Sequence, residues 1–287
     1  MAGVRVVTDS ASDLTEDLAR QYDVRVVPLT IRFGEEELVD RRDLSPDEFW
    51  RRCESSAALP ETAAPSPGAF QEAYEDAAAA GAEGVVCVTI SAALSATYQA
   101  ARAAADAVAD RIPVRVVDSR FVTMGEGLLV VTAAEAAAGG ASLDEVAEAV
   151  EDAIGRTRVY GAVATLDHLQ RGGRIGGAKA MLGSLLSIKP VICVRDGEVA
   201  EESKQRTRGR SLEYLAGKVK ADAPLERLAV ADGNADDLDV LLERLGDIEA
   251  THPMVVAKLG PVVGTHAGPG TVGVAYQLPA GRSRTAG

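Results

Sequence analysis

The sequence predicts an α/β fold with two domains: an N-terminal three-layer α/β/α domain with a parallel sheet, and a C-terminal two-layer α/β domain with a mixed sheet. Two observations lead to this prediction. In the first half of the chain, short runs rich in valine alternate with longer helical segments, and the runs are apolar throughout, which is typical of parallel strands covered on both faces. A chain of 287 residues with 47% apolar residues is also long enough to form two cores.

The N-terminal domain is expected to cover residues 1–158. Its strands are predicted in the apolar runs VRVVTDS from residue 4, VRVVPLTI from residue 24, GVVCVTI from residue 84 and VRVVDS from residue 114. Amphipathic or alanine-rich segments predict helices at residues 15–22, 46–53, 67–80, 95–109 and 144–154. A new strand begins at about residue 159, in TRVYGAVATLDHL, and we place the domain boundary there.

The C-terminal domain is expected to cover residues 159–287. The Asp-Gly pair in PVICVRDGEV lies between two β-rich runs, which is a strong signal for a hairpin. Later segments predict a helix at residues 236–245 and the strands RLAVADG, MVVAKLG and TVGVAY. Hairpins mixed with helices favour a two-layer α/β domain with a mixed sheet.

Charge and cysteine content narrow the class of protein. Lys and Arg number 30 and Asp and Glu 43, so the net charge is −13 and the overall field repels nucleic acid and anionic membranes. We therefore expect no nucleic-acid partner and at most a transient membrane contact. The cysteines Cys53, Cys87 and Cys193 are far apart without CxxC spacing, which favours a reduced, cytoplasmic location and no metal site. No signal peptide is visible, and the longest apolar stretches are too short to span a bilayer.

Hydroxyl side chains gather where a predicted strand meets a predicted helix. In VTISAALSATYQAA, Ser91, Ser95 and Thr97 follow the strand that begins at residue 84. Ligands of open parallel sheets bind beyond the carboxyl ends of the strands, near helix N-termini. Ser95 is therefore a candidate donor to an anion, although taken alone a serine at such a junction is more often only the N-cap of the helix. Thr62 lies in a loop stiffened by prolines, and its alternative interpretation is an ordinary solvated threonine.

One histidine lies in surroundings that suit a ligand. GTHAGPGTVGVAY places His266 in a glycine-rich turn just before the last strand, and an imidazole can donate a hydrogen bond to a carboxylate. His168 and His252 are interpreted as surface residues. Two basic segments also interrupt the acidic chain, LQRGGRIGGAKAMLGSLLSIKPV and KQRTRGR. Their glycines match no nucleotide-binding motif, so their arginines are either solvated charges or a patch for a phosphate group or a partner.

In combination, these motifs resemble the DegV family. They are TDSASDL, Thr62 in its loop, ISAALSATYQ, VVDSR, TLDHLQRGGRIGG, LLSIKPV, RTR and HAGPGTVGVAY, and they extend from about Val4 to Tyr276. The resemblance implies that one long-chain fatty acid is buried between the two domains. It also implies that the protein is the fatty-acid-binding subunit of a bacterial fatty acid kinase. A separate ATP-binding kinase subunit then phosphorylates the carboxylate, and the acyl phosphate enters phospholipid synthesis.

The resemblance also assigns roles to residues. Thr62, Ser95 and His266 match the positions that hold the fatty-acid carboxylate, with Ser91 close by. The basic positions near the head group and the kinase subunit are matched by Arg171, Arg174 and Arg206. The sequence departs from many relatives in having alanine at 63, 64 and 96, and Ala231 and Asp232 where many have a histidine nearby. The proposed donors are intact, and these departures are expected to affect only the head-group pocket or the partner surface.

No catalytic machinery is evident in the sequence. It contains no nucleophile elbow, no metal-ligand spacing such as HxxEH and no nucleotide loop, so we expect a non-catalytic binding subunit with no cofactor other than the bound fatty acid. Two alternatives stay open. The protein could be a lipid carrier or sensor without a kinase, or a lipid hydrolase that uses Ser95 and His266 as nucleophile and base.

Overall fold

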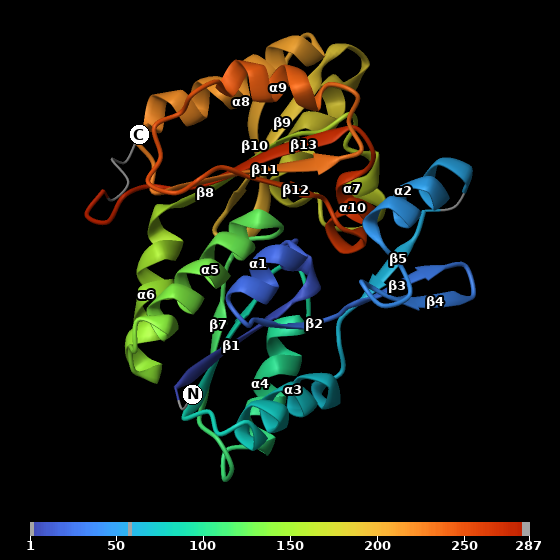
Figure 1. Ribbon diagram of the computed structural model, residues 1–287. Helices are drawn as coiled ribbons and strands as arrows, with labels where there is room; N and C mark the ends of the chain where they lie inside the picture. Colours follow the sequence, from blue (N-terminus) through green and yellow to red (C-terminus); the bar gives the residue numbers. More distant parts are fainter. Residues whose placement is uncertain (1–2, 57–58, 283–287) are drawn as a thin grey trace.

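The computed structural model describes residues 3–56 and 59–282, with the side chains of 183–187 left out, and it contains two large sheets that lie one above the other (Figure 1). All strands of the first sheet are parallel, in the order β2-β1-β6-β7. Their bounds are β1 Val4–Asp9, β2 Arg25–Val27, β6 Gly84–Thr89 and β7 Val114–Asp118. The buried β6, GVVCVT, is apolar apart from its last residue, as a strand covered on both faces must be.

Helices cover both faces of this sheet, so the predicted three-layer arrangement is confirmed. On one face lie α3 (Pro67–Ala79) and α4 (Thr97–Ala107). The other face is covered by α5 (Met124–Ala138) and α6 (Leu143–Arg156), with the shorter α1 (Glu16–Gln21) alongside. Helix α5 was not predicted from the sequence. Its apolar surface extends around the whole helix because both sheets pack against it.

The second sheet is mixed, as predicted, in the order β10-β9-β8-β13-β11-β12. Only β11 and β12 pair in parallel. The strand bounds are β8 Thr157–Ala162, β9 Lys189–Arg195, β10 Glu198–Gln205, β11 Arg227–Gly233, β12 Val255–Lys258 and β13 Thr271–Gln277. The predicted hairpin joins β9 to β10, where Asp196 and Gly197 have φ values of 52° and 84°. Positive φ at both turn residues is what a type I′ turn requires.

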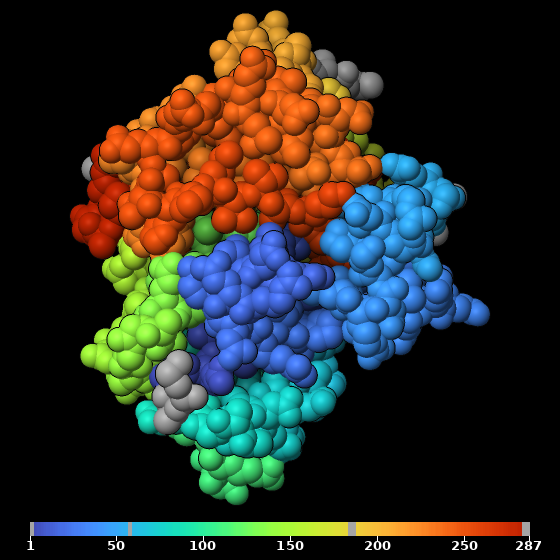
Figure 2. Space-filling model, in the orientation of Figure 1, coloured from blue at the N-terminus to red at the C-terminus, as the bar shows by residue number. Residues whose placement is uncertain are grey.

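Helices α8 (Arg208–Asp222) and α9 (Leu238–Leu245) cover the outer face of the second sheet. Its inner face meets the N-terminal part of the chain, so this domain has the predicted two layers. Figure 2 shows the two halves in contact, with the light-blue segment that contains α2 (Pro46–Ser55) against the orange and red second half. Short helices α7 (Asp167–Arg171) and α10 (Pro261–Ala267), with the 3-10 segments at Ser10–Ser12 and Gly176–Ser187, are the other helical elements described.

A small third sheet was not predicted. It has the antiparallel order β4-β3-β5, with bounds β3 Thr30–Phe33, β4 Glu36–Val39 and β5 Glu61–Ala63. The single strand expected from residue 24 is therefore wrong, because the chain leaves the first sheet at Val27 and enters this one at Thr30. Pro28 stands at the break, and proline cannot donate a ladder hydrogen bond.

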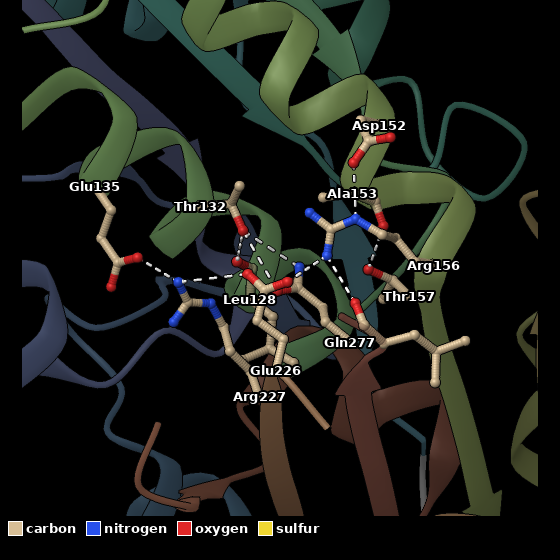
Figure 3. Close-up of polar contacts among 11 residues, drawn as sticks. Leu128, Thr132, Glu135, Asp152, Ala153, Arg156, Thr157, Glu226, Arg227 and Gln277 are labelled. Carbon is tan, nitrogen blue, oxygen red and sulfur yellow. Dashed lines mark hydrogen bonds and ion pairs between the residues drawn. The ribbon is translucent and has the colours of Figure 1, made fainter. Parts of the chain in front are cut away.

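A polar network joins α5 and α6 to the second sheet (Figure 3). Arg156 donates hydrogen bonds to the carboxylates of Asp152 and Glu226 and to the carbonyl of Leu278. Arg227 forms ion pairs with Glu135 on α5 and with the neighbouring Glu226. Because both guanidinium groups are at least nine-tenths buried and paired, the network fixes α5 and α6 against β11 and β13.

Candidate functional site

An apolar cavity of about 110 Å³ lies between the second sheet and the N-terminal part of the chain. Residues from both halves line it. The first half contributes Leu29, Ile90, Leu94 and Val122, and the second half contributes Val159, Ile192, Val194, Val199, Ala231, Leu259, Val262, Val263 and Ala275, among others. The wall is aliphatic except for one tyrosine, Tyr160, and a few polar residues. Such a cavity suits a flexible hydrocarbon chain.

Three of the predicted head-group residues, Thr62, Ser95 and His266, line this cavity. Thr62 Oγ1 lies 3.0 Å from His266 Nε2, although the two residues are 204 positions apart. Ser95 Oγ lies 2.8 Å from Thr97 Oγ1. The folding of the chain thus brings a hydroxyl from β5, a hydroxyl ahead of α4 and an imidazole from α10 to one apolar cavity. Hydroxyl and imidazole groups of this kind can donate hydrogen bonds to a carboxylate.

The local structure at two of these residues differs from the prediction. His266 lies in the last turn of α10, not in a glycine-rich turn, because the helix begins at Pro261 and continues through Gly264. Ser95 is not the N-cap of α4, since Ala96 occupies that position and makes no side-chain cap. The Ser95 hydroxyl instead accepts a hydrogen bond from the backbone N–H of Thr97 at 3.3 Å. Thr62 pairs with Ile31 in the small sheet, so a strand rather than a loop holds it.

The imidazole of His266 is electrically neutral at pH 7. Burial lowers its pKa from 6.5 to about 4, and the nearby Arg174 and His168 contribute in the same direction. Its Nδ1 atom is buried and has no hydrogen-bond partner. A β-carbon at Gly172 would lie 2.2 Å from that atom, so only glycine permits this close approach. The site therefore holds an imidazole with one nitrogen on Thr62 and the other unpaired.

Ser91 does not line the cavity. Its hydroxyl donates a 2.7 Å hydrogen bond to the carbonyl of Gly197, in the turn between β9 and β10. Both residues are buried, so this bond fastens the hairpin of the second sheet to the loop that carries Ser95. The structure thus separates Ser91, which joins two distant segments, from the three residues that meet at the cavity.

The three arginines singled out in the sequence lie in different surroundings. Arg174 lines the cavity, and its guanidinium donates to the carbonyls of Leu94 at 3.1 Å and Gly172 at 2.7 Å. Arg171 is exposed and lines a surface depression of about 330 Å³ that also contains Thr62, Arg174 and His266. Arg206 is exposed between β10 and α8 and lines neither the cavity nor this depression.

His168 also lines the depression, so its interpretation as a residue of the open helix surface was incomplete. Its Nδ1 atom lies 3.3 Å from the carbonyl oxygen of Thr265, next to His266. A β-carbon at Gly268 would lie 2.7 Å from its ring, which explains glycine at that position. The sequence gave no indication of this contact, because His168 and Thr265 are 97 residues apart and lie on different helices.

A buried carboxyl group and a tryptophan hold the start of the helix that carries His266. Asp13 Oδ1 accepts a 2.9 Å hydrogen bond from the backbone N–H of Gly260, directly before α10. Trp50 Nε1 donates to the carbonyl of Leu259 at 3.1 Å. Burial raises the pKa of Asp13 to about 7, and it raises the pKa of the nearby Asp9 to about 6. The N-terminal half therefore sets the position of α10 through named contacts.

The fold and the cavity define an α/β protein of two domains with an apolar cavity between its sheets. A family model described as "Uncharacterised protein, DegV family" matches residues 3–278, and the chain belongs to the DegV family. A DegV domain-containing protein of Mycobacterium bovis is 39% identical over 284 residues, covering 96% of this chain and 98% of the relative. A second one, of Streptomyces coelicolor, is 34% identical over 278 residues, covering 94% and 97%.

Solved structures of the family share this fold. A DegV family protein from Thermus thermophilus, described as binding fatty acid, is 35% identical and superposes with a TM-score of 0.86, covering 96% of this chain and all (100%) of that one. DegV from Bacillus subtilis, described as a fatty acid binding protein, is 27% identical with a TM-score of 0.84, covering 97% and 100%. These neighbours are fatty-acid-binding proteins of the same architecture.

Two further findings concern the described part of the chain. Within residues 3–56 and 59–282, no group of three or more His, Cys, Asp or Glu residues is arranged to hold a metal ion. Over the same ranges, no helix combines the length and the apolar character needed to cross a bilayer.

Proposed function

We propose that this protein binds one long-chain fatty acid in the cavity between its domains, with the carboxylate at Thr62, Ser95 and His266. The observation that carries the proposal is that these three side chains line one largely aliphatic cavity, with Thr62 and His266 in contact. The described function of the Thermus and Bacillus relatives supports it. We divide the chain into an N-terminal domain of residues 1–158 and a C-terminal domain of residues 159–287, with the ligand between them.

The two parts of the ligand have different roles in this proposal. Burial of a methylene group contributes about 0.8 kcal/mol, so a chain of about fifteen carbons gains roughly 12 kcal/mol before the costs of association. The acyl chain therefore supplies most of the affinity. A buried carboxylate without donors would be strongly unfavourable, and the hydroxyls and the imidazole meet that need. The polar groups thus fix the orientation of the ligand.

We further propose that the bound carboxylate is presented to a separate ATP-binding kinase subunit. The acyl phosphate formed there would serve phospholipid synthesis in the bacterial cytoplasm, with at most transient contact with a membrane. Support comes from the depression beside Thr62 and His266, whose rim includes the cations Arg171 and Arg174. The chain itself shows no nucleotide-binding loop, so the kinase would supply ATP, its metal ion and charge stabilisation.

Mass spectrometry of an organic extract of the purified protein tests the main proposal, and one fatty acid per chain is the expected result. Thr62→Val and His266→Leu should each weaken fatty-acid binding by about 1.5–3 kcal/mol, or tenfold to a hundredfold in Kd, because each removes a hydrogen bond to a charge. Thr251→Val, at an exposed threonine, is the matched control. A protein that carries no lipid and binds none in solution would refute the proposal.

The kinase coupling has its own test. Incubation with a DegV-partner kinase subunit, ATP and fatty acid should yield acyl phosphate, and Arg171→Ala or Arg206→Ala should reduce the yield while leaving lipid affinity nearly unchanged. Bound lipid without acyl phosphate from any cognate kinase would favour the carrier or sensor instead. The hydrolase alternative gains no support, since Ser95 Oγ is bonded to Thr97 and not to His266. Turnover of acyl esters that is lost in Ser95→Ala would revive it.

A further inference from the structure

The two faces of the second sheet carry side chains of very different size. On the outer face, under α8 and α9, the strands β11 and β13 present Leu228, Val230, Val272, Val274 and Tyr276. On the inner face, toward the cavity, the same two strands present Ala229, Ala231, Gly233, Thr271, Gly273 and Ala275. Side chains alternate between faces along a strand, so this difference is built into the sequences RLAVADG and TVGVAYQ.

The strand register gathers the smallest of these residues into one line across the sheet. Ala231 lies directly opposite Gly273, and Gly273 lies directly opposite Gly161 on β8. Directly opposed residues share a face. All three residues line the cavity, and we call Ala231, Gly273 and Gly161 the small-residue row. Ile192, opposite Gly161 on β9, continues the same line with a large side chain.

Neither glycine of the row is required by the protein itself. Neither has a positive φ. A β-carbon at Gly161 would meet nothing closer than Ile192 Cγ1 at 3.6 Å, which is an ordinary contact. At Gly273 the nearest atoms would be Tyr160 O at 3.3 Å and Ala231 Cβ at 3.6 Å, so a slight shift would suffice. By contrast, a β-carbon at Gly125 on α5 would lie 2.3 Å from Val159 Cγ2.

Glycine weakens a strand, and within a strand it often marks a place where a ligand approaches the backbone. The opposite wall of the cavity gives an independent sign of a ligand. Thr123 is 6% exposed and lines the cavity. Its hydroxyl makes no hydrogen bond of normal length, although it lies near enough to Asp13 to lower the pKa of that carboxyl. The cavity beside the small-residue row is therefore also lined by a hydroxyl, that of Thr123, which lacks a hydrogen bond of normal length.

The row lies beyond the head-group end of the cavity. Thr271 Oγ1 donates to the carbonyl of Ala267, the residue after His266, at 2.9 Å. Gly273 comes two residues later in β13, about 7 Å farther along the strand. An acyl chain whose carboxylate contacts His266 and which extends along β13 would cross the row within its first few methylene groups. The size of the side chains in the small-residue row therefore determines how much of the acyl chain can be buried.

We propose that Gly161 and Gly273 determine the length of acyl chain that the protein accepts, because the absence of side chains at these positions leaves the channel open across the sheet. The inference rests on the proposed fatty-acid function and deepens it. A valine at either position would place its methyl groups in the space between the sheet and the wall formed by Ile90 and Val122. Chains would then end at the row, and carbons beyond it would stay in water.

The test compares palmitate with octanoate by displacement of a fluorescent fatty acid from delipidated protein. The unmodified protein should prefer palmitate strongly. In Gly161→Val and Gly273→Val, the ratio of the two affinities should fall by about tenfold or more, which corresponds to keeping two or more methylene groups out of the channel. Gly217→Val adds the same side chain on the exposed face of α8, where a β-carbon meets nothing within 4 Å, and should leave the ratio unchanged.

The outcomes separate this inference from the function on which it rests. If the unmodified protein binds palmitate and the valine variants keep its preference over octanoate, the inference is wrong and the fatty-acid proposal stands. An equal loss of affinity for palmitate and for octanoate would also overturn the inference. If the unmodified protein binds neither ligand, both fail. Should a valine variant not fold, Gly161→Ala, whose added carbon makes only ordinary contacts, should still give a smaller fall in the ratio.

Discussion

The neutral state of His266 leads to a pH dependence of ligand binding. In the empty site, burial lowers the pKa of this imidazole from 6.5 to about 4, so charging it there costs about 3 kcal/mol. A carboxylate about 4 Å away would attract the imidazolium by roughly 4 kcal/mol at the effective dielectric constant of a partly buried site. The two effects nearly cancel. We therefore expect His266 in the complex to titrate near its ordinary pKa of about 6.5.

The sign of the effect follows from the proton count. Between about pH 4 and pH 6.5, the complex holds a proton on His266 that the empty protein does not hold, so fatty-acid affinity must rise as the pH falls. With these two pKa values, the gain in affinity between about pH 8 and pH 5.5 is about tenfold. Above about pH 7 the imidazole is neutral in both states, and the affinity should be nearly constant.

Isothermal titration of delipidated protein across this pH range measures the effect, and buffers of different ionisation enthalpy report the proton taken up. His266→Gln keeps a hydrogen-bonding side chain of similar length without the titration, and it should lack the slope. Protonation of the fatty acid itself is common to both proteins, so their difference isolates His266. Equal pH dependence in the two proteins, or no proton uptake below about pH 6.5, would refute the reasoning.

Three further predictions concern groups that hold the site in place. Ser91→Ala leaves the buried carbonyl of Gly197 without its donor and should lower the free energy of unfolding by about 1–3 kcal/mol in a denaturant titration; a loss no larger than that of Ser95→Ala would contradict the role given to Ser91. Arg156→Met removes the partner of Asp152 and Glu226 and should lower the free energy of unfolding by about 1–3 kcal/mol, whereas Arg210→Met, at an exposed arginine, should cost little. Similar losses in the two variants would mean that the network of Figure 3 adds no stability. Burial raises the pKa of Asp13 from 3.8 to about 7, so the stability from its protonated form is complete below about pH 4 and is lost as the pH rises through 7. Asp13→Asn keeps an oxygen for Gly260 and should flatten this fall in the free energy of unfolding, and parallel curves for the two proteins would count against the raised pKa.

Local patterns were sufficient for much of the fold. The strand and hairpin signals depend on neighbouring residues, as in the Asp196-Gly197 turn, whose φ values the sequence pair itself favours. The alternation of strands and helices likewise gave the layers of both domains. The same method missed α5 and α10, because tertiary contacts override local preference there. Gly264 suggests a turn, yet a β-carbon there would lie 2.7 Å from the ring of Phe49, so the glycine serves the packing of α10 against α2.

The site was predictable only in part, for a similar reason. The resemblance to a family singled out Thr62, Ser95 and His266, but no pattern within the chain shows that Thr62 meets a histidine 204 residues away. Ser91 and Ser95 look alike in ISAALSAT, and only the fold distinguishes them. One hydroxyl bonds a hairpin 106 residues later, and the other lines the cavity. Contacts between distant segments decide the role of each hydroxyl.

The position of the cavity follows from the register of three strands. On the inner face, Arg227, Gln277 and Thr157 are opposed at one end, where they meet the polar groups of α5 and α6 (Figure 3). Two residues along each strand, the line becomes Ala229, Ala275 and Val159, which pack with α5. After two more residues comes the small-residue row, and then Gly233 opposite Thr271, beside the helix of His266.

The inner face thus changes in character along these strands. Polar and charged side chains come first, then apolar side chains, then the small-residue row, and last the hydroxyl of Thr271. At the charged end, ion pairs from Arg156 to Glu226 and from Arg227 to Glu135 hold α6 and α5 against the second sheet. The open row lies where small residues leave the face uncovered, so the empty space forms between the fixed end and His266. A shift of one residue in the register of β13 would turn Val272 and Val274 into this space and close it. The cavity is therefore a consequence of strand pairing as much as of the residues at its polar end.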